Sequence, residues 1–308
     1  MNSSHFPINF KKTAKVFTEN IYLISLVLII VILSILGDIF TRNSYLTIPL
    51  IISISLSYFI SKLGIPILRN IKFHQTIKRE GPKNHIQKSG TPTMGGILII
   101  PIGLLVGNFF YLDYISKSQI IAISYLTISY MFIGIFDDWK GLSRNTNKGL
   151  SGKAKIFLQI IASLLFLYWA FINGWINPNI NLFFSLSFDF GMMIWPFSLF
   201  VLLAESNATN LTDGLDGLAS GCGALVFTGL ALHLNLSEQI NNHALASFCI
   251  GMAGVWIGFL FHNKNPAKVF MGDTGSLAMG ATLSGVALIT NNLWALLLMG
   301  GIFLAESL

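Results

Sequence analysis

The stretch that decides the fold is residues 244–261, ALASFCIGMAGVWIGFLF, which contains no charged side chain. A helix rises about 1.5 Å per residue, so this stretch nearly crosses a bilayer core of about 30 Å. Similar runs recur along the chain, and only 10% of its 308 residues are charged, against about 25% in an ordinary soluble domain. The sequence therefore predicts an all-α polytopic membrane protein and excludes most soluble folds.

Charged or turn-rich residues separate ten apolar segments, so we expect about ten transmembrane helices. The segments are Ile21–Gly37, Tyr45–Ser61, Met94–Leu112, Ser118–Phe136, Ile156–Trp175, Gly191–Ala204, Leu218–Leu236, Ala244–Phe261, Ser276–Ile289 and Leu293–Ala305. The first follows three lysines but precedes no small-residue cleavage site, which indicates a retained helix rather than a signal peptide. We divide the chain into a tail plus helix over 1–44 and a membrane domain over 45–308.

The basic residues are concentrated in alternate loops. Sixteen of the nineteen Lys and Arg lie in the N-terminal tail and in residues 69–92, 137–155 and 263–274. The positive-inside rule makes this the cytoplasmic face. Topology accounts for the net charge of +6 better than nucleic acid does, because no basic stretch is interleaved with aromatic residues. Cys222 and Cys249 both lie in apolar runs, which indicates neither a disulfide framework nor a cysteine metal site.

Five aspartates lie at segment ends on the same face: Asp137, Asp138, Asp213, Asp216 and Asp273. A carboxylate beside a membrane span is costly unless it is solvated, paired or liganded, so such residues indicate a functional site. Helix capping is the alternative for each one alone, because Asp suits the positive end of a helix. Three separate acidic motifs on one face favour the functional interpretation.

The acidic motifs are accompanied by basic, glycine-rich ones. Oxygen ligands without a His-Cys cluster favour Mg²⁺ or Mn²⁺ over zinc. Cations and glycine-rich turns beside them suit a phosphorylated substrate, and phosphoryl transfer depends mainly on such an arrangement of charge. The acidic motifs read IFDDW over 135–139, NATNLTDGLDG over 207–217 and FMGDTGS over 270–276, and the basic ones read REGPKNH over 79–85 and KSGTPTMGG over 88–96.

With these motifs in this order, the sequence from about Tyr45 to Leu308 resembles the phospho-N-acetylmuramoyl-pentapeptide transferase family, within a broader superfamily of polyprenyl-phosphate sugar-phosphate transferases. The resemblance implies transfer of phospho-MurNAc-pentapeptide from UDP-MurNAc-pentapeptide to undecaprenyl phosphate, giving lipid I and UMP in peptidoglycan synthesis. It also implies Mg²⁺, a bacterial-type inner membrane with the active site on the cytoplasmic face, and a homodimer.

The resemblance also implies roles for residues. Asp137, Asp138 and Asp273 are the expected catalytic residues, and Asp273, Asp138 and Asp213 the expected metal ligands. Expected substrate contacts are Lys88, Thr93, His85, Lys153, Asn207, Asn210, Asp213, Asp216 and Phe270. Packing is the alternative for Phe270, and a solvated position is the alternative for His85. Membrane orientation is the alternative for both Lys153 and Lys155, of which family position favours Lys153. Glu205 either supports the Asn207 motif or reaches the interface.

Two features depart from the family pattern. The segment Ile21–Gly37 is an additional N-terminal helix, and the chain stops within an apolar segment at Glu306-Ser307-Leu308. The family continues with a His-rich loop and a last helix, so we expect a C-terminally incomplete chain. The alternative functions are a polyprenyl-phosphate GlcNAc-1-phosphate transferase and an ion-coupled transporter, whose acidic residues would lie near the membrane midplane.

Overall fold

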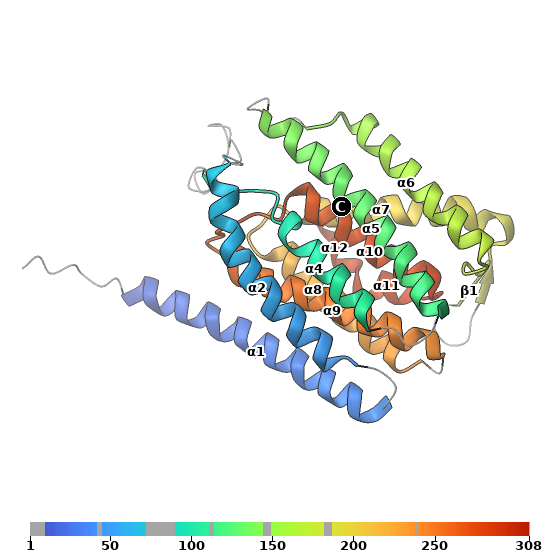
Figure 1. Ribbon diagram of the computed structural model, residues 1–308, viewed down its shortest axis with the longest axis horizontal. Coiled ribbons are helices and arrows are strands. Elements are labelled where there is room, and N and C mark those ends of the chain that lie inside the picture. Colours follow the sequence, from blue (N-terminus) through green and yellow to red (C-terminus); the bar gives the residue numbers. More distant parts are fainter. Residues whose placement is uncertain are drawn as a thin grey trace, which may run out of the picture.

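The computed structural model describes residues 10–41, 45–71, 90–110, 114–143, 149–181, 187–237 and 239–307, and helices dominate them (Figure 1). The elements in chain order are α1 (Phe10–Thr41), α2 (Thr47–Asn70), α4 (Gly96–Phe109), α5 (Tyr114–Ser143), α6 (Gly152–Ile172), β1 (Asn179–Asn181), β2 (Ser187–Asp189), η1 (Gly191–Met193), α7 (Ile194–Thr212), α8 (Leu218–Asn235), α9 (Ile240–Asn263), α10 (Gly272–Ile289), α11 (Leu293–Met299) and α12 (Gly301–Ser307). The prediction of a helical fold is confirmed, with one small antiparallel hairpin, β1–β2, added to it.

Seven helical stretches among the described residues are long and apolar enough to cross a membrane. They coincide with seven of the ten predicted segments. The other three differ: α4 has only 14 residues, α10 carries many small polar residues, and the last segment is divided between α11 and α12. The number ten therefore stays a prediction, while the polytopic membrane fold is confirmed.

The last predicted segment is broken at Gly300 and Gly301. Glycine weakens a helix interior by about 1 kcal/mol relative to alanine, and here two glycines are adjacent. A Cβ atom at Gly300 would lie 2.8 Å from the Leu296 carbonyl oxygen and 3.1 Å from Glu205 Oε1 of α7. The break thus lies beside Glu205 of α7, the helix that packs against α12.

Helices α9 and α10 form the centre of the bundle. Every side chain of α10 from Thr274 to Ile289 is buried, and 94% of the apolar window of α9 is buried. Helices α5, α7 and α4 pack around α10, while α2, α8 and α4 pack around α9. Small residues permit this close packing, as they do between helices in membranes generally.

Three glycines bring the backbones of neighbouring helices against α10. A Cβ atom would lie 2.4 Å from Gly275 N if placed at Gly96, 2.3 Å from Asp273 O if placed at Gly134, and 2.5 Å from Glu205 O if placed at Gly280. Real Cβ atoms do not approach so closely, so each position requires glycine. The N-terminal half of α10 is therefore held by α4, α5 and α7.

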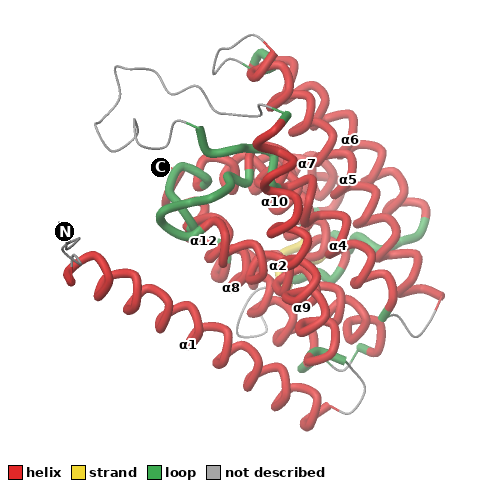
Figure 2. The backbone as a smooth tube through the Cα atoms, turned by 60° about the vertical axis from the view of Figure 1, so that its left-hand side comes forward, coloured by secondary structure: helices red, strands yellow, loops and turns green. Residues whose placement is uncertain are grey.

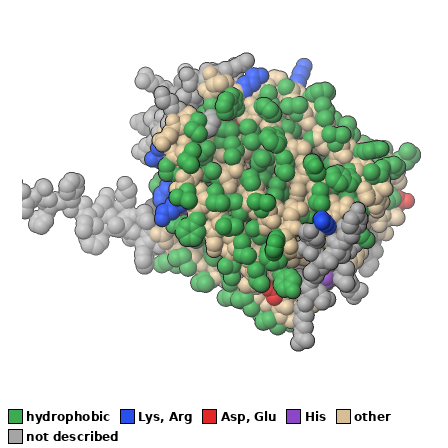
Figure 3. Space-filling model, viewed as in Figure 1, with side chains coloured by type: hydrophobic (Ala, Val, Ile, Leu, Met, Phe, Trp, Pro, Cys, Tyr) green, Lys and Arg blue, Asp and Glu red, His purple; other side chains and the backbone are tan. Residues whose placement is uncertain are grey.

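The outer surface is largely apolar. Figure 3 shows hydrophobic side chains gathered over one face, with Lys and Arg mainly near its edge. Helix α1 lies at the margin of the bundle (Figures 1 and 2), and many of its large apolar side chains are exposed, including Tyr22 and Phe40. Its Asp38 carboxylate accepts bonds from Leu46 N and Thr47 N at the start of α2, at 2.6 and 3.0 Å. An apolar surface of this kind suits contact with lipid.

The connections between helices gather at two ends of the bundle. The β1–β2 hairpin lies at one end, where Asn291 Nδ2 donates to Asn179 O at 2.9 Å. The other end carries residues 90–95, 149–151, 213–217 and 264–271, and we call it the aspartate end. The predicted convergence of the alternate loops on one face is observed for these residues, because their side chains and backbones bond to one another as described next.

Candidate active site

The N-terminus of α10 lies at the centre of the aspartate end. The strand-like residues before α4 pair with those before α10: Phe270 N donates to Pro92 O at 2.8 Å, and Gly95 N donates to Phe270 O at 2.9 Å. Gly96 N donates to Met271 O at 3.0 Å. These bonds join two motifs that are about 180 residues apart in the chain. They fix where α10 begins relative to α4.

Asp138 of α5 caps α10 from outside that helix. Its Oδ1 accepts a bond from Asp273 N at 3.2 Å, and its Oδ2 accepts bonds from Thr274 N at 3.1 Å and Thr274 Oγ1 at 2.7 Å. The first N–H groups of a helix have no partner within the helix and favour negative charge. The Asp138 carboxylate supplies both requirements, and it thereby holds the backbone of Asp273 in place.

Gly272 permits this close approach. Its φ is +72°, a left-handed conformation that side chains other than glycine rarely adopt. A Cβ atom here would lie 2.5 Å from Asp138 Oδ2 and 2.9 Å from Thr93 Oγ1. The buried Thr93 thus lies beside the same carboxylate. The glycine of the third acidic motif is required both by backbone conformation and by lack of space.

Lys155 of α6 joins the other two aspartates. Its Nζ donates to Asp273 Oδ2 and lies 3.4 Å from Asp137 Oδ1. Asp273 Oδ1 accepts a second bond from Asn210 Nδ2 at 2.8 Å, and Asp137 Oδ1 accepts one from Leu150 N at 3.1 Å. Four segments far apart in the sequence therefore meet at one ion-pair network.

The network remains partly open to solvent. The side chains of Lys155, Asp137 and Asp273 are 18%, 15% and 23% exposed. Two carboxylates, those of Asp137 and Asp273, share one ammonium group, and Asp138 lies against the backbone of Asp273, so negative charge is in excess. A partly buried site with excess carboxylate favours a further cation, because uncompensated charge is costly away from water.

The oxygen donors of this network fit Mg²⁺ by their chemistry. Asp137 and Asp273 already share the Lys155 ammonium group. Carboxylates are hard ligands of the kind that Mg²⁺ prefers. No group of three or more His, Cys, Asp or Glu with metal-binding geometry is found in the described part of the chain. Both oxygens of Asp138 bond to the start of α10, whereas Asp137 and Asp273 bond to the Lys155 ammonium group, which a metal ion can replace. Metal roles for Asp138, Asp213 and Asp273 stay predictions.

Comparisons with known proteins give matches along most of the chain. The chain matches the family described as glycosyl transferase family 4 over residues 120–291, and signature 1 of phospho-N-acetylmuramoyl-pentapeptide-transferase over residues 88–100. Curated proteins of that name are 58% identical in Prochlorococcus marinus strain MIT 9313 and 53% identical in Synechococcus sp. strain CC9605. The first alignment covers 88% of this chain and 73% of the relative, and the second covers 92% and 81%.

The chain belongs to the phospho-N-acetylmuramoyl-pentapeptide transferase family. It is accordingly a phospho-sugar transferase of the membrane. A further relative of that name, from Prochlorococcus marinus strain NATL2A, aligns with all of this chain at 48% identity and with 83% of its own length. That alignment includes α1. In this transferase, the described part of the signature, 90–100, contains Thr93 and Gly96, which lie against the start of α10.

The second acidic motif of the transferase divides between the network and its supports. Asn210 lies in the network and also donates to Ser276 Oγ at 2.9 Å. Asn207 instead donates to Gln159 Oε1 of α6 at 2.9 Å. Asp216 Oδ2 accepts bonds from Asn265 Nδ2 and Ala267 N, both at 3.1 Å. Asp216 therefore ties the α7–α8 turn to the loop before α10.

Other predicted residues lie nearby or outside the described chain. Asp213 follows α7, and its N–H donates to Asn210 O at 3.3 Å. The Phe270 backbone bonds to residues 92 and 95, and its side chain is half-buried. The predicted substrate contacts Lys88 and His85 lie outside the described residues. Substrate and metal roles for all these residues stay predictions.

Lys155, and not the Lys153 that family position favours, is the lysine of this network. The structure leaves Lys153 exposed. Two residues correspond to about 200° of rotation around a helix, so the two lysines lie on nearly opposite faces. Gln159 is the sequence feature that indicates Lys155. An amide within an apolar span marks the inward face of the helix, and Lys155 is one turn before Gln159 on that face. Gln159 is fully buried.

Proposed function

We propose that this protein transfers phospho-MurNAc-pentapeptide from UDP-MurNAc-pentapeptide to undecaprenyl phosphate, which yields lipid I and UMP. An oxygen of the lipid phosphate forms a new bond to the sugar-linked phosphorus, and the bond from that phosphorus to UMP breaks. The observation that carries the proposal is the network of Asp137, Asp273, Lys155 and Asn210 at one end of a membrane bundle. The names of the relatives support the substrates.

The charge of the site indicates how its residues act. Both substrates are anionic, and the site itself is rich in carboxylates, so cations must lie between them. Asp273 and Asp137 are the residues that we expect to hold Mg²⁺. When bound, Mg²⁺ would neutralise charge on the diphosphate and on the departing UMP. Lys155 orients both carboxylates through its ammonium group, and Asp138 positions Asp273 through the start of α10.

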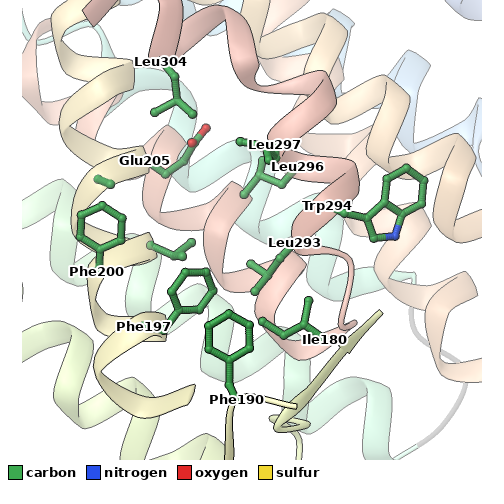
Figure 4. A pocket seen from close by; sticks show the side chains of 12 residues that line it. Ile180, Phe190, Phe197, Phe200, Glu205, Leu293, Trp294, Leu296, Leu297 and Leu304 are labelled. Carbon is green, nitrogen blue, oxygen red and sulfur yellow. The ribbon is translucent and has the colours of Figure 1, made fainter. Parts of the chain in front are cut away.

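An apolar cavity supports a place for the polyprenyl chain. Its volume is about 440 Å³, and it lies between α7 and the α11–α12 pair (Figure 4). Phe197, Phe200 and Val201 line it from one face of α7, and Leu293 and Leu297 line it from α11. Glu205 is the one charged residue that lines it among the described residues, and it lies about one and a half turns before Asn210 on the same helix. A phosphate at the network and an isoprenoid chain in this cavity would fit one lipid.

The position of the basic residues supports an orientation of the site relative to the membrane. Among the described residues, Lys264 and Lys268 lie at the aspartate end and Lys155 lies in its network, and the positive-inside rule favours the cytoplasmic side for basic residues. We therefore place the site on the cytoplasmic face of a bacterial inner membrane. We also propose a homodimer, on the family resemblance alone; sedimentation of the purified protein in detergent tests that assignment.

The deciding experiment measures UMP release by the purified protein with undecaprenyl phosphate and UDP-MurNAc-pentapeptide. We expect release that requires Mg²⁺, stops in EDTA and falls about 100-fold or more in Asp273→Asn. Asp189→Asn, on the hairpin at the opposite end, is the matched control and should retain activity. UDP-GlcNAc as the better donor would indicate a GlcNAc-1-phosphate transferase instead. Full activity of Asp273→Asn would refute the proposed site.

A further inference from the structure

A second cavity, which has polar and basic residues in its lining, lies at the aspartate end. It is separate from the aspartate network. Its volume is about 360 Å³. It is formed where α1, α2 and α9 approach the loop that follows α9. The residues that matter here are Asn20, Tyr58, His262, Lys264, Asn265 and Lys268. None of these residues belongs to the network around Asp273.

The cavity is basic. Lys264 and Lys268 line it, and among the described residues that line it none is acidic. Lys62 of α2 and Lys268 lie within electrostatic range of His262. The Lys264 ammonium group donates to Asn20 Oδ1, which is a neutral partner. The Asp216 carboxylate contacts the Asn265 amide and contributes one negative charge. Lys62, Lys264 and Lys268 together exceed it, so the field at the cavity is net positive.

The cavity lies at the depth where membrane spans end. Asn20 is the first residue of one candidate span, and Asn263 is the last residue of another. Lys264 and Lys268 follow immediately. Basic pockets between transmembrane helices at this level recognise the phosphates of lipid headgroups. Phe59 and Leu63 of α2 and Tyr22 of α1 are exposed apolar side chains close in sequence to the lining residues, and they suit contact with acyl chains.

Hydrogen bonds hold the walls of the cavity in place. His262 Nε2 bonds to Tyr58 O at 3.1 Å, and the two rings stack at 4.9 Å. The His262 carbonyl accepts a bond from Lys268 N at 2.8 Å, and Asn263 Nδ2 donates to Val269 O at 2.9 Å. The basic residues therefore extend from a backbone that is fixed before any ligand arrives, which lowers the entropic cost of binding.

We propose that this cavity binds the phosphate headgroup of an anionic membrane phospholipid. The ligand is distinct from the two substrates, and the inference does not depend on the proposed reaction. Positive charge, the depth at the span ends and the flanking apolar side chains together favour a lipid over a soluble anion. Each lysine near an anionic lipid contributes about 1 kcal/mol, or roughly fivefold in affinity.

The test is native mass spectrometry of the protein released from nanodiscs that contain equal amounts of phosphatidylglycerol and phosphatidylcholine. We expect the parent protein to retain one phosphatidylglycerol in preference to phosphatidylcholine. The variant Lys264→Gln/Lys268→Gln should bind it about 25-fold more weakly, from two losses of roughly fivefold. Arg69→Gln, an exposed basic change at the same end of α2, should retain it. Lys268→Gln alone, with an expected fivefold loss, serves if the double variant does not fold.

Three results would overturn the proposal. The first is equal retention of the two lipids by the parent protein. The second is unchanged retention of phosphatidylglycerol when the lysines are replaced. The third is full displacement of phosphatidylglycerol by excess inorganic phosphate, which would assign the cavity to a soluble anion. UMP release measured on the same samples separates this result from failure of the proposed reaction.

Discussion

Replacement of Asp138 by alanine tests whether an external cap holds the start of α10. The substitution removes three bonds, with donor–acceptor distances of 3.2, 3.1 and 2.7 Å. Loss of an N-terminal cap costs about 0.5–2 kcal/mol, and loss of a further bond from a hydroxyl to a charged group costs about 1.5–3 kcal/mol. Allowing for partial replacement by water, we expect the free energy of unfolding to fall by about 2–4 kcal/mol.

The assay is denaturant-induced unfolding in detergent, with the parent protein and two variants compared under identical conditions. Asp138→Asn keeps one acceptor oxygen but places an NH₂ group against donors of α10, so we expect about half of the loss seen for alanine. Asp189→Ala is the control, because that carboxylate accepts one bond, from Gly191 N at 2.8 Å, on the exposed hairpin. Its loss should stay below about 1 kcal/mol, as for most surface changes.

The activity of the same variants separates positioning from direct chemistry. If Asp138 acts by holding Asp273, then UMP release and stability should decline in the same order, from parent to asparagine to alanine. An alanine variant whose stability lies within about 0.5 kcal/mol of the parent would show that the cap contributes little and would refute this reasoning. Full stability with lost activity would instead indicate that Asp138 acts on substrate.

Two further substitutions test the geometry of the site. Gly272→Ala should lower stability by about 2 kcal/mol or more, because its φ is +72° and the new Cβ would lie 2.5 Å from Asp138 Oδ2. Gly214→Ala, where a Cβ meets only Leu211 O at 3.9 Å, is the control in the same thermal unfolding measurement. Lys155→Met should reduce UMP release about 100-fold and lower the Mg²⁺ concentration for half-maximal activity, since an ammonium group no longer competes for the carboxylates. A Mg²⁺ requirement that rises, or an equal effect of Lys153→Met, would contradict this assignment.

The sequence predicted the membrane spans well because the physical signal is local. A bilayer demands about 20 apolar residues in succession, and seven predicted segments meet that demand in the structure. Helix α10 fails the same test because it contains Asp273 and several small polar residues, which the surrounding protein accommodates. Its Thr282 hydroxyl contacts that of Thr127 at 2.8 Å, and its Ser276 carbonyl accepts a bond from Thr209. Helix α9 is buried as well and is strongly apolar, so burial in protein permits small polar residues without requiring them.

Which side chains meet depends on how the helices are rotated and packed against one another. A local sequence pattern contains little information about that packing. Asn207 and Asn210 belong to one motif, and we predict substrate contacts for both. In the structure, Asn207 contacts Gln159 and Asn210 contacts Asp273. Three residues correspond to about 300° of rotation, which leaves the two asparagines only about 60° apart on one side of α7, and they still contact different partners. Lys153 and Lys155, about 200° apart on α6, are separated by helix rotation itself. Partners from other helices decide the outcome, and a single motif does not contain them.

Capping and catalysis, which the sequence presents as alternatives for each aspartate, are linked in the structure. Asp138 is a cap, but the helix that it caps is α10 rather than its own, and the first residues of α10 include Asp273. A carboxylate that satisfies those N–H groups therefore also sets the position of the proposed metal ligand. It follows that loss of activity at Asp138 does not identify a catalytic group by itself. Because capping requires only an acceptor at the start of α10, a variant that restores the acceptor without the charge should recover stability and activity together.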